Sequence, residues 1–233
     1  MLKRCFAYLI VFAGTLGMTM GQNQAPATAP SPGPAAAPAP APAPTPVEVQ
    51  VFISVSEQKL ALVVNGKVLR TYKVSTSRYG EGDYLGSWRT PLGRLAVANK
   101  IGGSAPAGAV FNGRHLTGEI LSVNAPGRDP IVSRIIWLRG MEAGNKYAYR
   151  RCIYIHGTPQ EEFLGRKSSF GCVRMASSDV MELYPWIQIG TEVAIVDKPI
   201  NRAAIKEEFG QPRLVAASNL KPEDRTVAAV AVR

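Results

Sequence analysis

Residues 25–46, APATAPSPGPAAAPAPAPAPTP, alternate alanine and proline so closely that neither a helix nor a sheet can form there. Proline lacks an amide donor and fixes φ, so we expect an extended, semi-rigid polyproline spacer. We assign residues 22–46 to this linker. It separates a short N-terminal segment from a folded domain, which we predict at residues 47–199.

The first 21 residues have the pattern of a secretory signal peptide. Lys3 and Arg4 precede the apolar stretch CFAYLIVFAGTLGM, and small residues follow it. This stretch is short for a membrane-spanning helix. We therefore expect a secreted protein of the periplasm or cell envelope. Its N-terminal segment inserts in the membrane during export, and it remains an anchor if the signal is not cleaved.

The charge balance also limits the choice of partners. The chain has a formal net charge of +10, and such a basic excess fits an anionic partner. The predicted export argues against nucleic acid, so an anionic polymer of the cell envelope is the better candidate. Residues 200–233 mix charge, alanine and proline with weak periodicity. They predict a largely disordered tail, in which IKEEFG forms one or two helical turns.

Short runs of alternating apolar and polar residues predict β-strands within residues 47–199. Asn65 and Gly66 join two of these runs, and this dipeptide is typical of a two-residue hairpin because both positions need φ > 0. The runs that predict strands are VEVQVFISV, QKLALVV, GKVLRTYKVST, TPLGRLAVANKI, IVSRIIWLRG, RCIYIHG and GTEVAIVD.

Other segments predict a helix and a long loop. SSDVMELYPWI predicts a helix in which Asp179 is the N-cap and Glu182 completes a capping box. Residues 102–130 are rich in glycine, proline and asparagine and predict a long surface loop. We therefore expect a mainly β fold with one or two short helices.

The stretch IYIHGTPQEEFLGRKSSFGCVRM brings a histidine and a cysteine to the two ends of one loop. Strand alternation in RCIYIHG predicts that Cys152, Tyr154 and His156 share one face. A cysteine is only slightly ionised at neutral pH, and a neighbouring imidazole can take its proton. Cys172 is therefore a candidate nucleophile with His156 as its base.

Three other interpretations of these side chains stay open. Cys152 and Cys172 could form a disulfide, which would compete with His156 for the same sulfur. A metal site would have only His115 and His156 besides the two cysteines, without the paired spacing of a zinc motif. An inert buried thiol is the third interpretation, although SSFGCVRM is too polar for a typical core segment.

The residues beside the two candidates suit the same chemistry. Gly171 lets a substrate approach the backbone, and the amides of Gly171 and Cys172 are candidate donors to an oxyanion. Arg174 can grip a substrate carboxylate through two parallel hydrogen bonds, with a surface ion pair as the alternative. The Gly157 carbonyl can orient His156, and Asp179 is its side-chain rival.

Taken together, these segments resemble the L,D-transpeptidase catalytic domain, also called the YkuD or ErfK/YbiS family. The matching pieces occur in the family's order and span nearly all of residues 49–197. They are VSEQKLALVVNGKVLRTYKVST, RTPLGRLAVANKIG, YIHGT, SFGCVRM, DVMELY and GTEVAIV.

The resemblance implies a β-sandwich fold and a reaction on the stem peptides of peptidoglycan. Cys172 is then the nucleophile, His156 the general base and later acid, and Gly157 the residue whose carbonyl orients His156. Ser169, Gly171 and Arg174 fall on the (Ser/Thr)xGCxR segment, which shapes the donor site.

In the reaction that the resemblance implies, a thioester forms on the cysteine as the terminal D-alanine of a tetrapeptide leaves. An acceptor amine then gives a 3-3 cross-link or attaches a protein, and no cofactor or metal takes part. Two alternatives remain. One is a hydrolase of the same family, either an L,D-carboxypeptidase or an amidase that cleaves wall linkages. The other is a non-catalytic module that binds the cell wall.

One residue departs from the pattern of the family. Phe170 stands where many members have histidine, which puts acceptor choice or the tuning of the thiol in doubt. Trp88, beside Arg89 in a glycine-rich loop, has two possible places, in the core or along the substrate groove.

Overall fold

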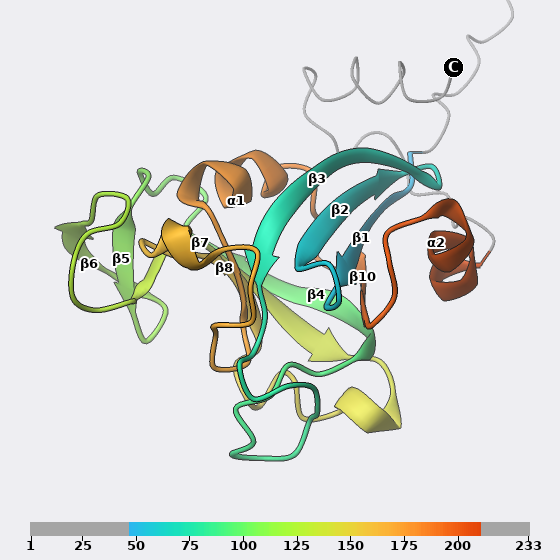
Figure 1. The fold of residues 1–233 in the computed structure, drawn as a ribbon. Helices are drawn as coiled ribbons and strands as arrows, with labels where there is room; N and C mark the ends of the chain where they lie inside the picture. Colours follow the sequence, from blue (N-terminus) through green and yellow to red (C-terminus); the bar gives the residue numbers. More distant parts are fainter. Residues whose placement is uncertain (1–46, 211–233) are drawn as a thin grey trace, which may run out of the picture. The chain divides into compact units, whose positions relative to one another are not determined.

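The computed structural model describes residues 47–210 of the 233-residue chain (Figure 1). The predicted signal peptide, the predicted linker and residues 211–233 of the predicted tail lie outside the described residues. Among residues 47–210, no helix is both long enough and apolar enough to cross a membrane.

The described part of the chain is mainly β, which confirms the predicted class. Its strands are β1 (Val49–Ser54), β2 (Lys59–Val64), β3 (Lys67–Ser75), β4 (Gly93–Ile101), β5 (Ala109–Asn112), β6 (His115–Ile120), β7 (Ile131–Gly140), β8 (Tyr154–Gly157), β9 (Val173–Met175) and β10 (Glu192–Val196). Its helices are α1 (Ser177–Leu183), α2 (Arg202–Phe209) and the 3-10 turns η1 (Ala143–Asn145) and η2 (Glu161–Phe163).

The strands form one sheet that closes on itself. They are ordered β4-β10-β1-β2-β3-β9-β8-β7-β5-β6. A further pairing of β4 with β7 closes the part of the sheet from β4 to β7 into a barrel-like ring, and β5 and β6 lie outside this ring (Figure 1). The predicted sandwich is corrected accordingly, because a sandwich needs two separate sheets. The register shift between Val97 and Asn99 marks an irregularity in the β4–β7 pair, and bulges of this kind let strands bend toward closure.

The predicted hairpin at Asn65 and Gly66 connects β2 to β3. Both residues have positive φ, 50° and 73°, as a two-residue hairpin turn of this type requires. The side chain of Asn65 also accepts a hydrogen bond of 2.9 Å from the amide of Glu48, so the turn is tied to the start of β1.

The main core fills the ring. Large side chains from most of its strands point inward, among them Leu62, Leu95, Ile136, Ile155 and Val173. Since removing apolar surface from water is the main stabilising contribution to folding, this alternation of inward and outward side chains fixes which face of each strand meets the interior.

A second cluster lies on the outer face of β1, β2 and β10, where α2 covers the sheet. Phe209 of α2 packs edge-on against Phe52 of β1, with ring centroids 6.5 Å apart. Strand β1 is therefore buried on both faces, whereas its alternation predicted burial on one face. Because α2 contains the predicted turns of IKEEFG, the folded unit extends beyond residue 199.

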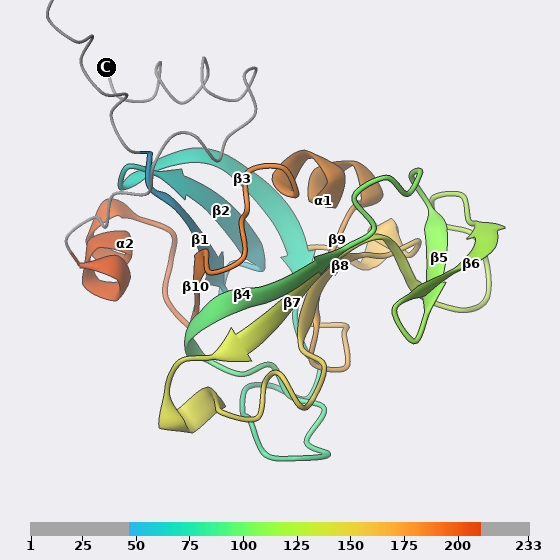
Figure 2. The ribbon, with the colours of Figure 1, turned by 180° about the vertical axis from the view of Figure 1, so that it is seen from behind.

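Two local predictions differ from the structure. Helix α1 begins at Ser177, so Asp179 lies in its first turn and is not the N-cap, and the predicted capping box does not form. Within the predicted loop 102–130, β5 and β6 form a hairpin that pairs with the start of β7 (Figure 2). Most side chains of β6 are exposed, so its sequence lacks the apolar alternation that would have predicted a strand.

Candidate active site

The adjacent strands β8 and β9 position the two candidate residues. They pair in parallel, with Ile155 opposite Val173 and His156 opposite Arg174. Ile155 and Val173 point into the main core, so His156 and Arg174 project from the outer face of the ring.

Cys172 immediately precedes β9 and packs on the same outer face. It contacts a small apolar cluster that includes Tyr154, Phe111 and Ile135. The cluster lies between the ring and the β5–β6 hairpin, so the thiol is sheltered on that side.

Cys152 lies outside the strand in which it was predicted, although its side chain packs on the same apolar cluster as Tyr154. It lies in the turn before β8 with φ of 57°, because β8 begins only at Tyr154. Cys152 and Cys172 are both free thiols, so the predicted alternative of a disulfide is not formed.

The sulfur of Cys172 is held by backbone atoms of the segment that leads into β8. The thiol donates to the carbonyl oxygen of Cys152 at 3.3 Å, and the amide of Tyr154 donates to the sulfur at 3.4 Å. Within residues 47–210, no hydrogen bond joins Cys172 to His156. Burial raises the pKa of Cys172 to about 11, so the thiol is protonated at neutral pH.

His156 has a defined tautomer. Its Nδ1 lies 2.8 Å from the carbonyl oxygen of Gly157, and a carbonyl can only accept, so Nδ1 carries the proton of the neutral ring. The side chain is 6% exposed, and burial lowers its pKa below the usual value. The imidazole is therefore neutral at pH 7, and the lone pair of Nε2 is available to accept a proton.

Gly157 is required where it stands. A Cβ at this position would lie 2.5 Å from the carbonyl oxygen of Val132 in β7, closer than any real contact of this kind. The absence of a side chain thus lets β8 approach β7 and keeps the Gly157 carbonyl under the imidazole. The predicted rival, Asp179, bonds instead with the hydroxyl of its neighbour Ser178.

Arg174 is buried and braced inside the protein. Its Nη1 pairs with the carboxylate of Asp129, its Nη2 donates to the hydroxyl of Ser168, and the residue is 4% exposed. Thr158 donates to the other oxygen of the same carboxylate. Both terminal nitrogens of the guanidinium are therefore engaged, and Arg174 does not present the open fork that was predicted for a substrate carboxylate.

Asp129 is a residue of this site that the sequence did not single out. It stands at the end of the predicted loop, just before β7, and its carboxylate acts on His156 as well as on Arg174. The available signal was its position as an acidic residue directly before a buried strand, which is weak on its own.

The segment from Ser169 to Cys172 is clamped by its own side chains. Ser169 donates to the Cys172 carbonyl at 2.6 Å and accepts from the Gly171 amide at 3.2 Å. The Gly171 amide is thus already bonded, which counts against its predicted use as an oxyanion donor. Thr90 donates to the Gly171 carbonyl at 3.0 Å and ties this segment to the loop before β4.

Gly171 has φ of 121°, a conformation that other residues rarely adopt. A Cβ there would come within 3.2 Å of the carbonyl oxygen of Arg89. Gly171 therefore lets the 88–90 backbone pass close to the segment that carries Cys172.

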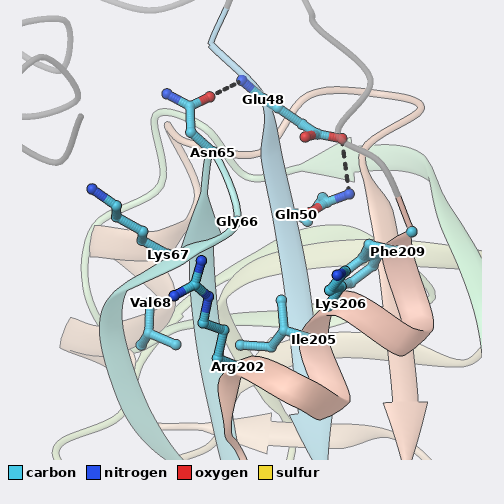
Figure 3. A pocket seen from close by; sticks show the side chains of 11 residues that line it. Glu48, Gln50, Asn65, Gly66, Lys67, Val68, Arg202, Ile205, Lys206 and Phe209 are labelled. Carbon is cyan, nitrogen blue, oxygen red and sulfur yellow. Dashed lines mark hydrogen bonds between the residues drawn. The ribbon is translucent and has the colours of Figure 1, made fainter.

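A pocket of about 460 Å³ lies elsewhere, between α2 and the β2–β3 hairpin (Figure 3). Its rim carries the basic side chains of Lys67, Arg202 and Lys206, and Ile205 and Phe209 of α2 line it. It shares no residue with the site around Cys172, and α2 and the β5–β6 hairpin lie on opposite sides of the ring in both views (Figures 1 and 2). Within the described residues, no group of three or more histidine, cysteine, aspartate or glutamate side chains could hold a metal ion.

The chain belongs to the L,D-transpeptidase catalytic domain family, YkuD, whose model matches residues 48–195. This range contains every residue of the site described above. The resemblance seen in the sequence motifs is thereby confirmed.

Two curated relatives show how far this similarity extends. YqjB of Bacillus subtilis (strain 168), whose name assigns it to the L,D-transpeptidases, is 32% identical over 139 residues, which are 60% of this chain and 66% of that protein. ErfK/SrfK of Salmonella typhimurium (strain LT2), named for the same family, is 36% identical over 50 residues, which are 22% of this chain and 16% of that protein. This chain thus spans slightly less than two thirds of the first relative and a small part of the second.

Two solved structures are also similar. An L,D-transpeptidase from Mycobacterium smegmatis has 18% identity and a TM-score of 0.43, covering 64% of this chain and 59% of that one. The L,D-transpeptidase of Xylanimonas cellulosilytica DSM 15894 (residues 123–326) has 22% identity and a TM-score of 0.42, covering 66% of this chain and 64% of that one.

Proposed function

We propose that the protein is an exported peptidoglycan L,D-transpeptidase of the cell envelope. In this proposal Cys172 forms a thioester with a stem tetrapeptide as D-alanine leaves, and an acceptor amine then gives a 3-3 cross-link or attaches a protein. The observation that carries the proposal is a thiol and a neutral imidazole on one face of the adjacent segments β8 and β9, with Nε2 of His156 available as a base.

The first step follows from the state of the thiol. Because burial raises the pKa of Cys172 to about 11, attack on the donor needs a base that removes the proton as the sulfur–carbon bond forms. His156 serves as that base after the thiol leaves the carbonyl of Cys152 and turns toward Nε2. The protonated imidazole then gives its proton to the departing amine of D-alanine as the peptide bond breaks.

The second step reverses these proton transfers. The acceptor amine attacks the thioester and loses a proton to His156, a new amide bond forms, and the sulfur leaves and is protonated again. The amide of Tyr154, which points at the sulfur at 3.4 Å, favours the anionic form of the leaving sulfur.

The other candidate residues act through positioning. The Gly157 carbonyl fixes the tautomer of His156, so that Nε2 is the nitrogen that accepts the proton. Ser169 and Gly171 hold the backbone of Cys172 against the 88–90 loop. Arg174, in its ion pair with Asp129, stabilises the donor site.

Incubation of the full-length protein with a tetrapeptide donor and an amine acceptor tests the proposal. Mass spectrometry is expected to detect release of D-alanine and a product that joins donor to acceptor. Cys172→Ala and His156→Ala should abolish both signals, whereas Cys152→Ser is the matched control because it removes the other thiol and keeps the carbonyl that accepts from Cys172.

Each alternative predicts a different product. Release of D-alanine with only hydrolysed donor, even at high acceptor concentration, would indicate a carboxypeptidase in place of a transpeptidase. Full activity of Cys172→Ala, or no reaction of the folded wild type with any donor, would contradict the catalytic role of this thiol.

A further inference from the structure

Three exposed aromatic side chains form a cluster beside Cys172, and we call it the aromatic ledge. Tyr79, Trp88 and Phe170 are 48%, 60% and 53% exposed. The ring of Phe170 lies 5.9 Å from that of Tyr79 and 5.9 Å from that of Trp88. Single exposed apolar residues are common, but grouped ones mark binding surfaces. The aromatic ledge is therefore a candidate binding surface.

The ledge is held in place by specific contacts. The guanidinium of Arg78 stacks over Phe170 at 4.5 Å and donates to the carbonyl of Ser168 at 2.8 Å, which fixes the position of the ring. Trp88 has φ of 57°, an unfavourable conformation for a bulky residue, and the hydroxyl of Ser77 bonds its carbonyl at 2.5 Å. Backbone strain of this kind is concentrated at functional sites, and here it accompanies an indole ring that is exposed to solvent.

The ledge is continuous with the site of the thiol. Phe170 is two residues before Cys172, which limits the separation of their Cα atoms to about 7 Å. The carbonyls of Trp88 and Arg89 lie against Gly171, the residue between them. When a donor is bound at the sulfur, the part of its stem that lies farther from the scissile bond can therefore reach the ledge.

We propose that the aromatic ledge is a subsite for the amino sugar that carries the donor's stem peptide, an inference that rests on the proposed function. Three stem residues separate that sugar from the acyl carbon and span about 10 Å when extended. This length exceeds the separation of at most about 7 Å between the Cα atoms of Cys172 and Phe170, so the sugar can reach the ledge while the acyl carbon is at the sulfur. The faces of a pyranose ring carry C–H groups that pack against flat aromatic rings.

The stem itself is a poorer occupant of the ledge, because small or charged side chains would not cover an exposed aromatic face. The positive charges beside the ledge also suit a donor made of a sugar and a stem peptide. Arg78 and Arg89 can attract the carboxylates of the stem while the sugar lies on the aromatic rings.

The test compares two donors, a disaccharide-tetrapeptide and the same tetrapeptide without sugar. The expected wild-type kcat/KM is three- to tenfold higher for the disaccharide donor, about the value of covering the exposed half of one aromatic side chain. Phe170→Ala and Trp88→Ala should each bring this ratio toward one. Phe170→Tyr keeps the ring and should keep the ratio. Ile189→Ala should also keep it, because it shortens an exposed apolar side chain in the turn before β10, away from the ledge.

The outcomes separate the ledge from the chemistry. Equal kcat/KM for the two donors in the wild type would overturn the ledge proposal and leave the transpeptidase standing. An equal loss for both donors in Phe170→Ala would also overturn it, because the ring would then contact the peptide or shape the loop. If neither donor reacts, the proposed function fails, and calorimetry with the disaccharide-tetrapeptide then tests the ledge proposal alone. Binding to the wild type that is lost in Trp88→Ala would support the ledge proposal, and absence of binding to the wild type would refute it.

Discussion

The structure predicts that the Cys172 thiol of the free protein reacts slowly with alkylating agents. Its pKa of about 11 leaves about one molecule in 10,000 as thiolate at pH 7, against about 3% for a cysteine of pKa 8.5. Because the thiolate is the reacting form, alkylation by iodoacetamide should be about 300-fold slower than for an unperturbed thiol. The rate should rise about tenfold per pH unit and level off only near pH 11.

The assay uses Cys152→Ser, so that Cys172 is the thiol observed in the folded domain, and mass spectrometry follows the peptide that contains it. His156→Gln should change the alkylation rate at pH 7 little, because a neutral imidazole does not stabilise a thiolate by its charge, yet it should abolish acyl transfer. A wild-type rate that levels off below pH 8, together with a lower rate at pH 7 in His156→Gln, would show a preformed thiolate–imidazolium pair and refute this reasoning.

Three further predictions concern the surroundings of the thiol. Gly157→Ala places a Cβ 2.5 Å from the Val132 carbonyl and should lower the free energy of unfolding in urea by about 1–3 kcal/mol; an unchanged value would mean that β8 can shift freely. Asp129→Ala leaves the Arg174 guanidinium buried without its carboxylate and should cost about 3 kcal/mol in the same assay, whereas a loss below about 1 kcal/mol would contradict a buried brace. Because burial lowers the pKa of His156, the unfolded chain takes up its proton first as the pH falls, so stability should decrease below about pH 6.5 and less so in His156→Gln; parallel urea midpoints for the two proteins from pH 7.5 to 5 would contradict this.

One local signal in the sequence predicted a turn correctly. Asn65 and Gly66 marked a hairpin because their conformation depends on neighbouring residues alone. Closure of the ring depends on pairings between distant segments, such as Val51 with Val193 and Val97 with Leu138. The alternation of apolar residues does not specify which strands pair. The strands were therefore predicted from the sequence, whereas the closed ring was not.

The positions of single atoms in the site could likewise be predicted only in part from the sequence. The order and spacing of His156 and Cys172 predicted that they meet. The parallel pairing of β8 with β9 puts them on one face, but no hydrogen bond joins them within residues 47–210. The strand alternation failed at Cys152, because a turn in which its amide bonds the Tyr149 carbonyl at 3.1 Å precedes β8, without a glycine or asparagine to mark it. The sulfur consequently bonds backbone atoms that no residue pattern identifies.

Residues far apart in the sequence account for the remaining differences. Arg174 was predicted to meet a substrate, but Asp129 reaches it from a loop 45 residues earlier. Phe170 departs from the pattern of the family, and the rings of Tyr79 and Trp88, from a loop more than 80 residues earlier, lie beside its ring. Each case depends on how a loop returns to the ring, which follows from the whole set of pairings.

The measurement that tests the central claim most directly is the intact mass of the protein after brief incubation with a tetrapeptide donor and no acceptor amine. We predict an added mass equal to the tetrapeptide without its terminal D-alanine, located on Cys172 by peptide mapping and absent from Cys172→Ala but present in Cys152→Ser. A folded wild-type protein that releases D-alanine without this adduct at any time point, or that carries it on another residue, would contradict the account.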